Sequence, residues 1–139
     1  MKLLPGVFQA RKKNGDIYYR SSVTYRGRHI SLGSFATQEN AHQAYNTATN
    51  LLRSEIHFLP DDYRTCDLPF SKWIVLNNFK NNGIYIKTPI YLQANYFEYY
   101  LSKEDVLLFD ADDLFYYSHH SIMRRGSHLF VADYGMQVN

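Results

Sequence analysis

Two short turn signals constrain the first third of the chain more than any other feature. Asn14-Gly15 and Arg26-Gly27 separate three runs that are rich in Tyr, Val, Ser and Ile, residues that suit a pleated strand surface. Asn and Gly tolerate the positive φ angles that a tight hairpin turn requires. The pattern therefore predicts three antiparallel strands, over residues 7–12, 17–25 and 28–35.

A helical pattern follows the third run. Thr37 is a favourable N-cap residue, and Glu39 places a negative charge in the first turn, where the helix dipole favours it. An apolar stripe recurs at helical spacing, formed by Ala41, Ala44, Tyr45, Ala48 and Leu52. Because alanine is small, we expect this helix to pack closely across one face of the sheet and to leave the other face open. His42 lies off the stripe and is expected at the surface.

Charge is divided unevenly along the chain. Residues 1–55 hold eight Lys and Arg against three Asp and Glu, a net +5, whereas residues 56–139 hold seven against ten, a net −3. The helical pattern ends before Leu59-Pro60, so we expect one domain over residues 1–56 and a second over 60–139. The basic part suits a polyanion, since each neutralised phosphate releases counterions, although a solubilising surface has the same composition.

The open face of the expected sheet would carry the polar residues that point away from the helix. By strand alternation they are Arg20, Ser22, Thr24, His29 and Ser31. Further basic residues of the first strand and the turns flank that face, namely Arg11, Lys12, Lys13, Arg26 and Arg28. A polar, cationic sheet face is a poor core surface, and it predicts a nucleic-acid-binding surface.

A set of residues along this part matches a known pattern. Its members are Gly6-Val7, the run 19–23, Gly27, the run 30–37, Ala41, Ala44-Tyr45 and Ala48. The most specific piece is the Leu-Gly-x-Phe-x-Thr sequence of residues 32–37 before a helix that contains Ala-Tyr. Together they resemble the Apetala-two domain of plant ethylene-response transcription factors and HNH-type homing endonucleases, and the arm-binding domains of phage and transposon integrases. The resemblance covers residues 5–53.

The resemblance implies a three-stranded sheet laid in the DNA major groove, which admits a β-ribbon and presents a distinct pattern for each base pair. By matching positions, the residues that it places against bases and phosphates are Arg20, Ser22, Thr24, His29 and Ser31. Of these, Arg20 best suits a base contact, because a guanidinium meets a guanine edge at two atoms. Phosphate contacts suit the flanking cations Arg11, Lys12, Lys13, Arg26 and Arg28. Ser22, Thr24 and Ser31 suit either role. Two DNA-facing arginines of the plant pattern correspond to Phe8 and Ala10, and a tryptophan to Ser31, so we expect a different target sequence.

The C-terminal part is dense in aromatic residues and gives weaker structural signals. Residues 71–79 suit a short helix or a buried strand, residues 84–87 a strand, and residues 102–105 the start of a helix. Residues 114–123 and 128–132 suit a hairpin. The aromatics predict a core with tyrosine hydroxyls at its rim, with a base-stacking platform for single strands as the alternative.

Carboxylates and imidazoles gather near the end of the chain: Asp110, Asp112, Asp113, His119, His120 and His128. Such side chains together hold divalent cations that activate water or clamp phosphates. The Asn and His of an HNH arrangement are not at the expected separations, however, and the acidic residues also suit an ordinary turn. We therefore predict no metal site, no catalytic residue and no cofactor.

These observations predict an α+β protein that binds double-stranded DNA without catalysis, as a regulator or a mobile-element or phage protein of the bacterial cytoplasm. The lone Cys66 rules out an intramolecular disulfide and favours a reducing compartment, and no apolar run approaches the roughly 20 residues that span a bilayer. The second domain would provide a homodimer or partner contact. The alternatives are a metal-dependent HNH-like homing nuclease or a fragment of one, and a DNA-mimicking inhibitor of a nucleic-acid enzyme.

Overall fold

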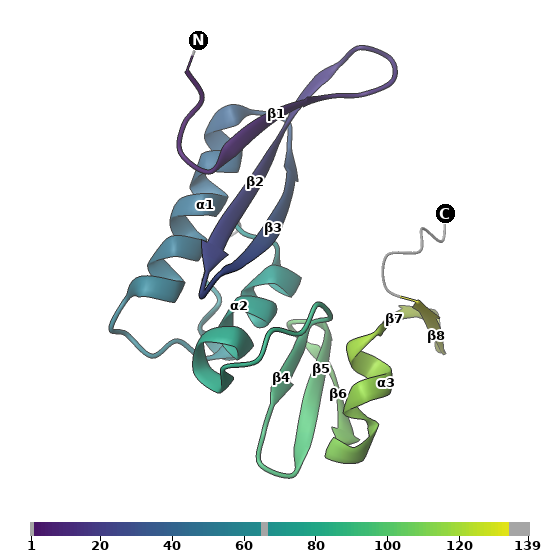
Figure 1. Ribbon diagram of the computed structural model, residues 1–139. Helices are drawn as coiled ribbons and strands as arrows, with labels where there is room; N and C mark the ends of the chain where they lie inside the picture. The colour runs from purple at the N-terminus through teal and green to yellow at the C-terminus, as the bar shows by residue number, and fades with distance from the viewer. Residues whose placement is uncertain (1, 65–66, 134–139) are drawn as a thin grey trace. The chain divides into compact units, whose positions relative to one another are not determined.

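The computed structural model describes residues 2–64 and 67–133 (Figure 1). The architecture is mixed α+β, as the sequence predicts: a three-stranded antiparallel sheet and a helix come first, and smaller sheets and helices follow. Among the described helices, none has the length and apolar character required to cross a membrane. Cys66, on which the expectation of a reducing compartment depends, lies outside the described residues.

The chain divides into two compact units. The first unit comprises Met1–Phe58 and Arg64–Pro69, and the second comprises Leu59–Tyr63 and Phe70–Asn139. The first break falls between Phe58 and Leu59. Residues 64–69 then belong to the first unit again, and Leu68 is fully buried.

The sheet of the first unit has the order β1 (Val7–Arg11), β2 (Ile17–Tyr25) and β3 (Arg28–Phe35), with both pairs antiparallel. Arg26 and Gly27 form the two-residue turn between β2 and β3, with φ angles of 50° and 78°. Positive φ at both turn positions matches the right-handed twist of the flanking strands. The three predicted strands are confirmed to within one residue at each end.

The helix α1 (Gln38–Arg53) covers one face of this sheet (Figure 1). Thr37 is the N-cap, as predicted, and its hydroxyl accepts a hydrogen bond from the Asn40 amide at 3.1 Å. The buried side chains of the helix are Ala41, Ala44, Ala48, Leu51 and Leu52, and those of the strands include Val7, Val23, Ile30 and Leu32. Small alanines on the helix let these branched side chains fill the interface.

The segment before β1 is bonded to α1. The Leu4 amide donates a hydrogen bond to Gln38 Oε1 at 2.6 Å, and His42 Nδ1 lies 2.9 Å from the Pro5 carbonyl oxygen. The His42 ring also stacks on Tyr45, with 6.1 Å between ring centroids. His42 thus keeps a partly exposed position off the apolar stripe, and it is also bonded to the segment that leads into the sheet.

Ser21 presents a buried hydroxyl on the face that α1 covers. Its side chain is 1% exposed, and its Oγ has no hydrogen-bond partner among the described residues. A buried, unpaired hydroxyl destabilises a fold by about 1–3 kcal/mol. We expect Ser21→Ala to raise the free energy of unfolding by about 1 kcal/mol in urea denaturation. Ser31→Ala, at an exposed position of the same sheet, should change it by less than about 0.5 kcal/mol; a loss of stability in Ser21→Ala would contradict the assignment.

The second unit begins with the 3₁₀ turn η1 (Pro60–Asp62) and the helix α2 (Phe70–Asn82). An antiparallel sheet follows, with the order β4 (Ile90–Leu92), β5 (Tyr96–Ser102) and β6 (Asp105–Asp110). The described part of this unit ends in the 3₁₀ turn η2 (Ala111–Asp113), the helix α3 (Leu114–Ser118) and a hairpin of β7 (His120–Arg125) and β8 (His128–Asp133). A buried hydrophobic cluster of the second unit consists of Ile86, Ile90, Phe97, Tyr99 and Ile122.

Three sequence expectations for the second unit need correction. Residues 84–87 form no strand, because the chain is held there by the buried Asn78 amide, which donates to the Ile84 carbonyl at 3.0 Å. Residues 102–105 start no helix and instead close the hairpin of β5 and β6. Of the expected strand 114–123, the first half is α3 and only the second half pairs with β8.

Candidate nucleic-acid interface

The sheet of the first unit has one buried and one exposed face. Val23 and Ile30 pair across β2 and β3 and are 4% and 1% exposed, because they lie under α1. The next pair along the strands, Thr24 and His29, is exposed. Side chains alternate between faces along a strand, so Thr24 and His29 mark the face opposite the helix, which we call the open face.

Three residues form a row across the open face. Phe8 on β1 pairs with Arg20 on β2, and Arg20 pairs with Ser34 on β3. All three are exposed, and we call them the central row. The sequence predicts Arg20 on this face, and the resemblance already aligns Phe8 with a DNA-facing position, but Ser34 was not expected there. Alternation along β1, where Phe8 follows the buried Val7, independently places Phe8 on this face.

Ser22 is buried, although the sequence predicts an exposed position for it. It pairs with the exposed Ser31 but is only 8% exposed. A β-bulge shifts the register beside this pair, leaving Leu32 as an extra, buried residue of β3. The Ser22 amide also donates a hydrogen bond to the Gly6 carbonyl at 3.1 Å, so the chain before β1 passes close to it. Ser22 is therefore poorly placed to contact a ligand.

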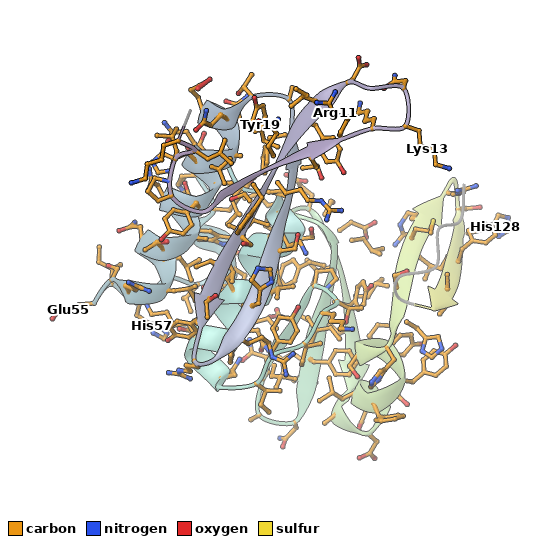
Figure 2. The ribbon with its side chains drawn as sticks, turned by 45° about the horizontal axis from the view of Figure 1, so that its top comes forward. Arg11, Lys13, Tyr19, Glu55, His57 and His128 are labelled. Carbon is orange, nitrogen blue, oxygen red and sulfur yellow. The ribbon has the colours of Figure 1, made fainter. Side chains whose placement is uncertain are left out.

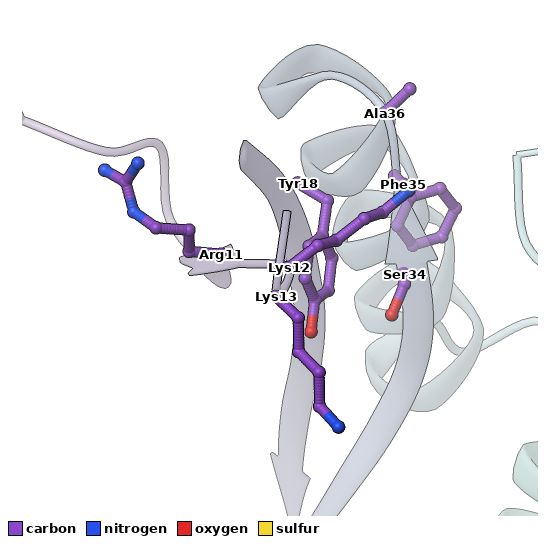
Figure 3. Close-up of a pocket in the computed structure, with 7 residues that line it drawn as sticks. All are labelled: Arg11, Lys12, Lys13, Tyr18, Ser34, Phe35 and Ala36. Carbon is purple, nitrogen blue, oxygen red and sulfur yellow. The ribbon is translucent and has the colours of Figure 1, made fainter. Parts of the chain in front are cut away.

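A basic loop joins β1 and β2 at one end of the sheet, where Figure 2 shows Lys13 projecting from the turn. An open hollow of about 610 Å³ lies beside it, lined by Arg11, Lys12, Lys13, Tyr18, Ser34, Phe35 and Ala36. In Figure 3 the Lys13 ammonium and the Tyr18 hydroxyl point in the same direction, whereas Arg11 points to the opposite side. The lysines of the loop and the hydroxyl of Tyr18 on β2 therefore bring positive charge and a hydroxyl donor to the edge of the open face.

The turn between β2 and β3 places another cation, Arg26, at the other end of the sheet. The Arg26 guanidinium carbon lies 5.0 Å from the centroid of the Tyr25 ring, a cation–π distance. Arg28 is exposed, but it pairs with Tyr25 and, by alternation, belongs to the face that α1 covers. Alternation along β1 also places Arg11 on the face that α1 covers. Its guanidinium donates a hydrogen bond to the Gly15 carbonyl at 3.0 Å. Arg11 and Arg28 thus flank the open face rather than lie on it.

Three of the six candidate metal-binding residues of the second unit, Asp110, His119 and His120, make local contacts. The Asp110 carboxylate caps η2 by accepting from the Asp112 amide at 2.9 Å. His119 Nδ1 lies 2.8 Å from the Phe115 carbonyl, and His120 stacks on Tyr116 with 3.9 Å between centroids. His128 lies on β8, as Figure 2 shows. Across residues 2–64 and 67–133, no three His, Cys, Asp or Glu side chains gather in a way that would hold a metal ion.

Comparison of the chain with protein-family models, curated proteins and solved structures found no match. The resemblance to the Apetala-two domain therefore depends on the residues quoted for it and stays a prediction.

Proposed function

We propose that the first unit binds double-stranded DNA without catalysis, by placing the open face of its sheet in the major groove. The observation that carries this proposal is the contrast between the two faces: α1 buries one, while the other exposes Arg20, Thr24, His29 and Ser31. Three strands spaced about 4.8 Å apart span roughly 10 Å, which fits a groove about 12 Å wide.

The residues of the open face divide into two roles. Arg20 lies on the middle strand, where a guanidinium meets the edge of a guanine at two atoms. Lys12, Lys13 and Arg26 lie in the two connecting turns at opposite ends of the sheet, where the groove is bordered by phosphates. Phosphate contacts fix the position of the protein, and base contacts supply sequence preference.

A second contact would strengthen binding, because one small module covers little DNA surface. We place that contact, through a second copy or a protein partner, on the second unit. Binding without catalysis acts by occupying a site, and it is the mode of action of a regulator or of an accessory protein of a mobile element.

A salt titration tests the proposal. We expect the full chain to prefer duplex over single-stranded DNA, with affinity falling between 50 and 200 mM salt at a log–log slope of about −3, the value for roughly three phosphates. Removing the loop charges in Lys12→Ala/Lys13→Ala should make that slope shallower by about 2. Fluorescence anisotropy with a labelled 20-base-pair duplex measures both quantities.

A matched variant controls for net charge. Lys87→Ala/Lys103→Ala removes the same charge from the second unit and should leave the slope within about 0.5 of the original value. Binding that does not depend on salt, or that is tighter on single strands, would contradict the proposal, and so would equal slope changes in the two double variants.

A further inference from the structure

An aromatic side chain stands on the otherwise polar open face. Phe8 is 53% exposed, whereas Val7 beside it on β1 is 5% exposed and lies under α1. An isolated exposed phenylalanine is common and needs no special account. The position of Phe8 is what distinguishes it, because it is the direct cross-strand partner of Arg20.

The pairing sets the distance between the two side chains. Residues that pair across antiparallel strands have Cβ atoms about 4.5–5.5 Å apart, and successive bases of a DNA strand are about 3.4 Å apart along the helix. When the Arg20 guanidinium meets one base pair, Phe8 therefore faces a neighbouring base pair of the same groove. Phe8 has no polar side-chain atom, so it cannot replace the water that a base amino or carbonyl group would lose on contact.

One group in the major groove suits such a side chain, namely the C5-methyl group of thymine. We propose that Phe8 contacts a thymine methyl next to the guanine read by Arg20, so that the preferred site contains a guanine with thymine at an adjacent base pair. This inference rests on the proposed function and adds the chemistry of the sequence that is recognised. Two effects would favour thymine. Its methyl group gains an apolar contact with the Phe8 ring, whereas the polar edge of another base would lose its hydrating water to the ring without gaining a hydrogen bond.

Replacing thymidine by deoxyuridine tests the contribution of the methyl group alone, because uracil forms the same base pair and lacks only that methyl. A duplex is first selected from a random-sequence library with the full chain, and it is then remade with each thymine replaced in turn. We expect replacement at one position to weaken binding about 4-fold, equivalent to ~0.8 kcal/mol for one buried methyl. Phe8→Ala should bind the thymine and uracil versions equally.

Two comparisons make the outcome decisive. Phe115→Ala removes a phenyl ring that is 80% exposed on α3, and it should keep the original thymine-to-uracil ratio. Thermal unfolding of Phe8→Ala should match the original chain, which separates a lost contact from lost structure. The inference alone would be overturned if the original chain bound the thymine duplex and every uracil-substituted duplex equally. It would also be overturned if Phe8→Ala kept the thymine-to-uracil ratio of the original chain. Failure to select any duplex would overturn the proposed function together with it.

Discussion

Arg20→Glu is expected to lower the affinity of the chain for its selected duplex about 100-fold. Arg20 is exposed at the centre of the open face, between Phe8 and Ser34 in the central row. Losing a bidentate guanine contact costs about 1–3 kcal/mol, and the new carboxylate faces acceptor atoms of the guanine and nearby phosphates. Anisotropy titrations at one fixed salt concentration measure the loss.

Two further variants separate base recognition from charge. Arg53→Glu makes the same change in net charge on the last turn of α1, the helix that covers the other face, and should reduce affinity less than about 3-fold. Arg20→Lys keeps the charge but not the planar fork, so its affinity should be intermediate and its sequence preference weaker. If Arg20→Glu and Arg53→Glu lost affinity equally, Arg20 would have no special place in the interface.

The first unit was predictable because its signals are local. Turn residues such as Gly27 fix the β2–β3 hairpin, and Thr37 with the alanine stripe fixes where α1 begins and which side it buries. The bulge beside the buried Ser22 was harder to predict. Gly33, with a φ of 122°, lies beside the bulge, and a glycine inside a strand pattern is its sequence signal.

The second unit was less predictable because contacts distant in sequence determine it. The fully buried Asn78 is one example, since its side-chain oxygen accepts a hydrogen bond from the Leu92 amide, fourteen positions away, at 2.9 Å. Asp105, which the sequence places at a helix start, instead binds Arg124 of β7 through two contacts at 2.6 and 3.0 Å. Periodicity and capping patterns carry no information about such partners.

Gly6→Ala is expected to remove about 3 kcal/mol from the free energy of unfolding of the first unit. Gly6 has a φ of 76°, which costs an alanine roughly 1 kcal/mol. The added Cβ would also overlap Cδ1 and Cγ of Tyr45, and relieving such an overlap costs about 1–3 kcal/mol more. Urea denaturation of the full chain, followed by circular dichroism, measures the loss.

Gly27→Ala separates the two causes, because Gly27 has nearly the same φ, 78°, and nothing lies within 4 Å of an added Cβ. It should cost only about 1 kcal/mol. In a Tyr45→Ala background, Gly6→Ala should also fall to about 1 kcal/mol, since the ring that it overlaps is gone. A full 3 kcal/mol loss in that background would assign the effect to the backbone alone. Because Gly6 directly precedes β1, the overlap would also displace Phe8, so Gly6→Ala should weaken duplex binding even in solutions where the chain remains folded.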